Sequence, residues 1–112
     1  MAATPTYRAG PAGSRSALNI STPTVIQASG NGWVFGIEVI TAPTAAGGVY
    51  DTTTTAGAAT SNQMAAIAIT DVHINLGGKP FFNGLVVNPG TGGVVAVYYD
   101  PTYITTPLNI PN

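Results

Sequence analysis

Few residues of this chain belong to the types that carry out catalysis, and they form no recognised motif. The sequence has one histidine, His73, and no cysteine. Nucleophilic catalysis needs an activated Ser, Thr or Cys beside a base, and the G-x-S-x-G sequence that presents such a serine is missing. His73 alternates with Val72 and Ile74 along a strand-like segment. We therefore interpret it as a surface or hydrogen-bonded residue and not as a catalytic base.

The acidic residues are also few: Glu38, Asp51, Asp71 and Asp100. Hydrolysis of a glycosidic bond needs two carboxylates that face each other across a cleft, whereas the three aspartates each stand at the end of an expected strand, where Asp commonly forms turns. Glu38 lies in mid-strand, and two interpretations stay open. It is either a solvated outward residue or, if buried, the partner of Arg8, Arg15 or Lys79, because an unpaired buried charge is costly.

Sites for metals, phosphates and cofactors are not indicated. The chain has no histidine pair, no cysteine and no D-x-D-x-D-G calcium loop. The glycine-rich Pro89–Gly93 lacks the Lys-Ser/Thr pair and the helix that follow a phosphate-binding loop, so we interpret it as a hairpin turn. The sequence predicts no catalytic residue, no metal and no cofactor, and we expect that the protein is not an enzyme.

The charge content excludes further classes of function. Charged residues make up 6% of the chain, against about 25% in an ordinary soluble domain. Three basic residues are too few for a stripe that binds nucleic acid. No apolar run approaches the roughly 20 residues of a membrane-spanning helix, and the N-terminal residues lack the apolar core of a secretory signal. Low charge suits a protein that packs among neighbours, although a solitary Thr-rich β domain would share it.

Short apolar runs separated by Gly, Pro and Asn predict an all-β fold in one domain. The expected strands are 16–21, 24–28, 33–41, 48–53, 64–70, 71–76, 82–87 and 93–100. Asn31-Gly32 predicts a type I′ hairpin before the strongest strand. The pattern as a whole predicts a single β-sandwich or jelly roll of seven to eight short antiparallel strands.

The alternation along 33–41 predicts which residues of this strand line the core. We expect the face with Trp33, Phe35, Ile37 and Val39 to lie between the sheets. Val95 and Val97, or the residues that alternate with them, are expected to lie opposite this face. The low-complexity stretch 52–66 is expected to be a long loop, with one helical turn as the alternative.

Extended arms are expected at both ends of the chain. The predicted organisation is an N-terminal arm over residues 1–15, a β-sandwich core over 16–100 and a C-terminal arm over 101–112. Gly and Pro in the arms disfavour helices and central strands. Each arm nevertheless carries large or basic side chains, which are expected to lie against another surface.

One stretch of the chain resembles a known group of proteins. The run FFNGLVVNPGTGGVVAVYYD, Phe81 to Asp100, is similar to the C-terminal signature of small structural proteins of tailed bacteriophages. GGVYDTTTTAGAATSNQMAAIAIT, Gly47 to Thr70, resembles the strand, turn and N-Q-hydrophobic-A pattern that precedes it. This resemblance implies a virion component with a β-sandwich or jelly-roll fold that decorates the head or forms a head-fibre base. Tyr99-Asp100 and the tail beyond them depart from the pattern.

Together these features predict a bacteriophage capsid decoration (cement) protein on the outer surface of the virion, which stabilises the head by binding the major capsid protein. We expect a homo-oligomer, with three subunits favoured, and neither nucleic acid nor membrane as a partner. The expected capsid contacts are Tyr7, Arg8 and Arg15. The expected subunit contacts are Tyr103, Ile104, Leu108 and Ile110. The alternative is a tail- or fibre-associated β-sandwich module that recognises glycan or a receptor.

Overall fold

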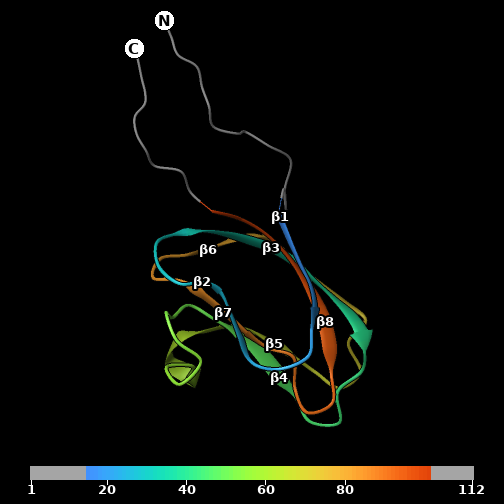
Figure 1. Cartoon of the computed structure of the whole chain (residues 1–112). Coiled ribbons are helices and arrows are strands. Elements are labelled where there is room, and N and C mark those ends of the chain that lie inside the picture. Colours follow the sequence, from blue (N-terminus) through green and yellow to red (C-terminus); the bar gives the residue numbers. More distant parts are fainter. Residues whose placement is uncertain (1–14, 102–112) are drawn as a thin grey trace, which may run out of the picture.

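The chain folds into two four-stranded antiparallel sheets that pack face to face (Figure 1). The computed structural model describes residues 15–101. The strands are β1 (Arg15–Ile20), β2 (Thr24–Gln27), β3 (Gly32–Thr41), β4 (Gly47–Tyr50), β5 (Gln63–Ile67), β6 (His73–Phe81), β7 (Leu85–Asn88) and β8 (Val94–Pro101). One sheet has the order β1-β8-β3-β6 and the other β2-β7-β4-β5. The predicted all-β sandwich is confirmed.

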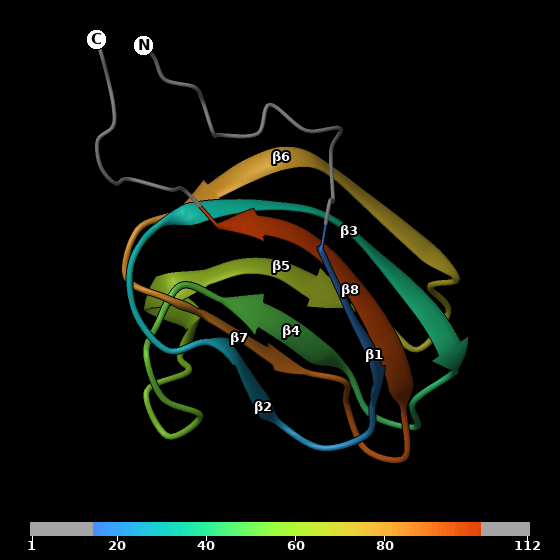
Figure 2. The same cartoon turned by 45° about the horizontal axis from the view of Figure 1, so that its top comes forward.

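The strands pair as in a jelly roll (Figure 2). β1 pairs with β8, β2 with β7, β3 with β6 and β4 with β5, as in one long antiparallel ribbon folded between β4 and β5. The ribbon is rolled so that β3 also pairs with β8 and β4 with β7, which produces the two sheets. Because the roll sends sequence neighbours to opposite sheets, β4 and β5 are the only consecutive strands that pair within residues 15–101.

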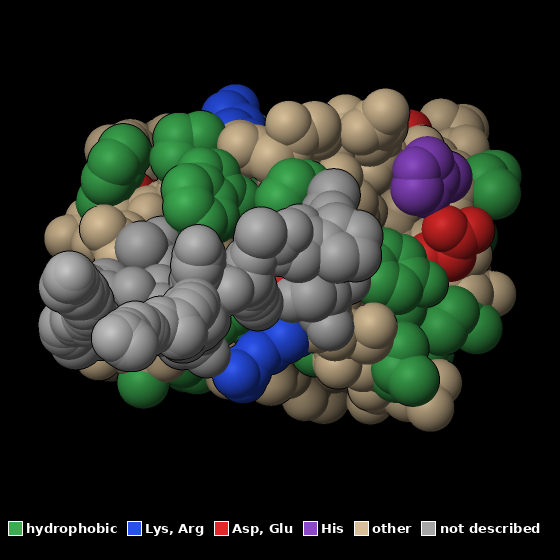
Figure 3. All heavy atoms as spheres, turned by 90° about the horizontal axis from the view of Figure 1, so that it is seen from above, with side chains coloured by type: hydrophobic (Ala, Val, Ile, Leu, Met, Phe, Trp, Pro, Cys, Tyr) green, Lys and Arg blue, Asp and Glu red, His purple; other side chains and the backbone are tan. Residues whose placement is uncertain are grey.

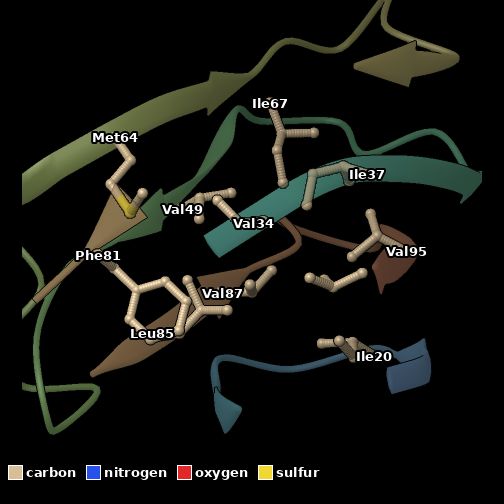
Figure 4. Packing of buried hydrophobic residues seen from close by; sticks show 11 residues of the cluster. Ile20, Val34, Ile37, Val49, Met64, Ile67, Phe81, Leu85, Val87 and Val95 are labelled. Carbon is tan, nitrogen blue, oxygen red and sulfur yellow. The ribbon is translucent and has the colours of Figure 1, made fainter. Parts of the chain in front are cut away.

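The space between the sheets is filled by apolar side chains, each contributed by one face of its strand (Figure 4). β2 contributes only the partly buried Ile26, which packs against the buried cluster. The buried cluster consists of Ile20, Val34, Ile37, Val49, Met64, Ile67, Phe81, Leu85, Val87, Val95 and Val97. Of the two alternatives on β8, Val95 and Val97 lie in the core, but they stand beside β3 in the same sheet and not opposite it. Full burial of one such side chain stabilises the fold by about 1.5–3 kcal/mol.

The prediction that Trp33 and Phe35 line the core is wrong. β3 shows a register shift between Val34 and Gly36 against both of its neighbours, which is a β-bulge. One extra residue exchanges the two faces of a strand, because side chains alternate with a period of two. Val34 therefore joins Ile37 in the core, whereas Trp33 is 42% exposed on the outer face. Phe35 is half-buried and is not part of the core cluster.

Two predicted hairpins are wrong for a topological reason. After β2, Asn31 directly precedes β3, which begins at Gly32, and Pro89–Gly93 lies between β7 and β8. In both cases the two strands belong to opposite sheets, so these turns cross the sandwich edge. The positive φ before β3 belongs to Gly30, at 87°, and not to Asn31 as a type I′ turn requires.

The boundaries of the core differ from the prediction by one residue at each end. β1 begins at Arg15 and β8 ends at Pro101, so both residues belong to the sandwich. The rest of the two predicted arms lies outside the described residues.

Two further element boundaries are corrected. The strands expected at 71–76 and 82–87 are observed as β6, which ends at Phe81, and β7, which begins at Leu85. The stretch 52–66 combines both alternatives considered for it: a loop, then one 3-10 turn, η1 (Thr60–Asn62), and then β5.

Candidate functional site

Exposed aromatic side chains lie at the end of the β1-β8-β3-β6 sheet where β3 begins and β6 ends. Trp33 is the partner of Pro80 across the β3–β6 ladder, so their side chains point to the same face. Phe82, two residues beyond Pro80, is 66% exposed. Phe35 lies two residues along β3 from Trp33. These four residues, Trp33, Phe35, Pro80 and Phe82, are termed the outer patch.

Glycines of β6 make room for the outer patch. A Cβ atom at Gly78 would stand 2.9 Å from Cε1 of the Phe35 ring, so a side chain there would displace the ring. Gly77 and Gly78 also have φ angles of 63° and 85°, which glycine adopts most easily. The Gly77-Gly78 pair therefore both bends the edge strand and lets Phe35 lie against it.

The start of β1 and the end of β8 lie at the end of the sheet where β3 begins (Figures 1 and 2). Arg15, the first residue of β1, is opposite Tyr99 on β8. Pro101, the last residue of β8, is opposite Gly32, which directly precedes Trp33. The two ends thus emerge from neighbouring strands of one sheet, at one end of the molecule.

The other end of the same face carries a hydrogen-bonded pair, His73 and Glu38. Nδ1 of His73 lies 2.8 Å from Oε1 of Glu38, and the imidazole N–H donates because a carboxylate only accepts. The two side chains are 51% and 44% exposed. The solvated interpretation of Glu38 is therefore the observed one, with a partner that the sequence interpretation did not consider. Figure 3 looks down on this face and shows the pair beside hydrophobic side chains. Ile40 and Val72, which are close to Glu38 and His73 in the sequence, are strongly exposed.

Two aspartates organise turns. The carboxylate of Asp51 accepts hydrogen bonds from the backbone N–H of Phe82, at 3.0 and 3.1 Å to its two oxygens, and from that of Asn83 at 2.8 Å. Oδ2 of Asp71 accepts one from the N–H of Ala68 at 2.7 Å. Asp51 ties the end of β4 to the β6–β7 turn, and through it holds the backbone of Phe82 in the outer patch.

At the edge of the sandwich formed by β5 and β6, side chains already hydrogen-bond to backbone carbonyl groups of β5. Nζ of Lys79 on β6 donates to the carbonyl oxygen of Met64 on β5 at 2.7 Å. Nε2 of Gln63 donates to the carbonyl oxygen of Ala65 at 3.3 Å. A lysine and bonded carbonyl groups make an edge strand less receptive to an incoming strand. The outer patch is therefore the stronger candidate for a binding surface.

The structure describes only one of the residues that were predicted to form interfaces, Arg15. Arg15 is exposed at the start of β1. The others lie outside the described residues: Tyr7, Arg8, Tyr103, Ile104, Leu108 and Ile110. The outer patch was missed because Trp33 and Phe35 were assigned to the core. The signal that points to it is Gly77-Gly78 followed by Pro80, which is typical of a bulged edge strand.

Within residues 15–101, no three His, Asp or Glu side chains are grouped so that they could hold a metal ion. None of the helical segments in that range has the length and hydropathy to cross a membrane. Comparison with known proteins identifies no relative: no family model, no curated protein and no solved structure matches this chain.

Proposed function

We propose that the chain is a bacteriophage capsid decoration protein, which binds the major capsid protein on the outer surface of the virion and stabilises the head. The observation that carries the proposal is the position of the two chain ends. β1 begins and β8 ends on adjacent strands, beside the outer patch. Segments 1–14 and 102–112 are thus joined to the sandwich at the end that carries the outer patch. Attachment through one end suits a protein that coats a lattice.

The side chains of the two terminal segments suit such an attachment. Fixing a segment costs roughly 1–2 kcal/mol per residue in backbone entropy. A partner offsets this cost with apolar contact, at about 25 cal/mol per Å² buried, and with main-chain hydrogen bonds gained by strand addition. Tyr7 and Arg8 can provide aromatic contact and pair with capsid carboxylates. The C-terminal segment 102–112 is uncharged and suits contact between subunits of a homotrimer.

The fold is compatible with the proposal. Jelly rolls occur in viral capsid proteins and in lectins, but a fold does not by itself define a function. Further support comes from the resemblance of Gly47–Thr70 and Phe81–Asp100 to structural proteins of tailed phages. These stretches form β4, β5, β7 and β8, so the resemblance concerns the framework and leaves the contact residues to be tested.

Copy number tests the proposal most directly. Quantitative mass spectrometry of virions from the genome that encodes this chain should give a number of copies of the same order as the major capsid protein. A number comparable to that of a tail or fibre component contradicts decoration.

Truncation tests the proposed mode of attachment. Removing residues 1–14 leaves β1 complete, so the sandwich should retain its thermal unfolding transition. The truncated protein should fail to bind heads that have been stripped of decoration, whereas the full chain should bind. Binding of both proteins with equal affinity contradicts a role of the N-terminal segment.

A second candidate function is supported by the exposure of Trp33 and Phe82. Aromatic side chains at the surface of a β-sandwich can stack on the apolar faces of sugar rings, as expected for a glycan-recognition module of a tail or fibre. The full chain would then bind oligosaccharides from the host surface, and Trp33→Ala would abolish this binding. The matched control is Val72→Ala, which removes an exposed apolar side chain just before the start of β6, at the opposite end of that strand from Pro80.

A further inference from the structure

We propose that the outer patch of one copy binds the C-terminal segment, residues 102–112, of a second copy of this chain. This inference rests on the homo-oligomer in the proposed function. It adds which surface of one copy accepts the segment and which end of the other copy supplies it. It requires neither the capsid nor the N-terminal segment.

The outer patch has the properties of a binding surface. Trp33 and Phe82 are large aromatic side chains that remain 42% and 66% exposed. Pro80 on β6 is also exposed and is the partner of Trp33 across the ladder. Aromatic residues carry much of the binding free energy of protein interfaces, and neighbouring exposed apolar side chains commonly mark an interaction site. The patch is also rigid, because β3 is paired on both sides and Asp51 holds the backbone at Phe82.

The C-terminal segment has the chemistry that fits this surface. Its sequence, TYITTPLNIPN, contains no charged side chain and includes Pro107 and Pro111. Aromatic-lined surfaces bind proline-containing extended segments, because proline reduces the entropy lost on binding. The side chains available to cover the aromatic rings are Tyr103, Ile104, Leu108 and Ile110.

The direction of β8 favours a second copy as the donor. β8 runs antiparallel to β3 and ends at Pro101, opposite Gly32. The chain therefore leaves the sheet at the first residue of β3, heading away from Trp33 and Phe35. To cover its own patch the segment must reverse at once, whereas a segment that continues outward can reach a neighbour. Eleven extended residues span at most about 36–40 Å, which is longer than the nine-residue strand β6 at about 3.3 Å per residue.

This arrangement also allows a closed ring. Each copy has one donor segment and one acceptor patch at the same end of the sandwich, so every copy both gives and receives a contact. Such head-to-tail contacts close into a ring when the rotation between copies is suitable. A trimer is one such ring.

Cross-linking between cysteine variants of the full chain tests the proposal, because the natural sequence has no cysteine. Pro80→Cys places a thiol on the patch and Thr106→Cys places one in the segment. The two single variants are mixed and treated with a short bismaleimide. We expect a cross-linked heterodimer, with a yield at least about tenfold lower when Trp33→Ala is added to the acceptor, as for loss of an aromatic hot spot. Val72→Cys replaces Pro80→Cys in the matched control and should give little product.

Three outcomes overturn the proposal. The first is cross-linking only within a single chain that carries both cysteines, which means that the segment covers its own patch. The second is an equal yield from Pro80→Cys and Val72→Cys, and the third is no cross-link in either arrangement. Head binding is measured separately. If the cross-link forms but the chain does not bind heads, the capsid function alone is overturned. If the chain binds heads but no cross-link forms, the exchange between copies alone is overturned.

The fluorescence of Trp33 gives a second readout that needs no new cysteine, since it is the only tryptophan. As the protein concentration rises, the emission should move to shorter wavelength and the sedimentation coefficient should increase together with it. The full chain with Ile104→Ser and Leu108→Ser should show neither change. Emission that does not depend on concentration contradicts docking from a second copy.

Discussion

Phe81 and Phe82 are neighbours in the sequence, yet the first is fully buried and the second lies mostly in solvent. Phe81 is the last residue of β6 and points between the sheets, whereas Phe82 lies in the bend that follows β6 and belongs to the outer patch. Phe81→Ala should lower the free energy of unfolding by about 3–5 kcal/mol, because it removes the contacts of a buried ring and leaves a cavity.

Phe82→Ala is the matched control for this prediction. In dilute solution, where subunit contacts are weak, it should change the free energy of unfolding by less than about 0.5 kcal/mol. Chemical denaturation of both variants checks the assignment. Equal losses would place both rings in the same environment and contradict the observed register of β6.

Gly77 and Gly78 form a second matched pair. Both have positive φ, so replacement by Ala at either position should cost about 1–2 kcal/mol in backbone strain. A Cβ at Gly78 would also meet the Phe35 ring, whereas a Cβ at Gly77 has no atom within 4 Å. Gly78→Ala should therefore be the more destabilising variant in thermal unfolding. If the two variants unfold alike, the packing of Phe35 against β6 contributes nothing.

At the scale of elements, the turn between β6 and β7 depends on a side chain from β4. Asp51 accepts three hydrogen bonds from the backbone of Phe82 and Asn83. Asp51→Ala leaves these donors without their acceptor and should cost about 1–3 kcal/mol. Asp51→Asn keeps one acceptor oxygen and should cost less. Denaturation curves that give the same stability for Asp51→Ala and the natural chain would show that water replaces the carboxylate without loss.

The edge strands β5 and β6 limit which partners can add a strand to the sheets. β6 carries Gly77-Gly78, Lys79 and Pro80, and β5 has carbonyl groups bonded by Lys79 and Gln63. These features discourage unspecific pairing of the sheet edge. The binding surface left on this side of the molecule is the outer patch, whose contacts depend on side chains and are therefore more selective.

At the scale of the whole molecule, the jelly roll pairs strands that are far apart in the sequence. β1 pairs with β8 and β2 with β7, and β4 and β5 alone form a local hairpin. Because distant pairs require the closure of long loops, folding should be slow and should begin at the β4–β5 hairpin.

Two buried valines test this folding order. Val49 on β4 and Val97 on β8 are both fully buried, so the change to Ala is chemically the same. Val49→Ala should mainly slow folding, and Val97→Ala should mainly accelerate unfolding. Stopped-flow measurements across a denaturant series check this expectation. The opposite assignment of rates would show that β8 pairs before the hairpin forms.

Local information in the chain was enough to predict the all-β class, the approximate positions of most strands and the turn role of Asp51. These features depend on residue type and on period-two alternation, which act within a few residues. The sheet to which each strand belongs was decided by the tertiary structure, because the same Gly and Asn residues serve a hairpin and a crossing between sheets. Tertiary structure also decided the outer patch. A bulge at Val34–Gly36 exchanges the faces of β3, and its position depends on the register with β6 and β8, whose partner residues lie far along the chain.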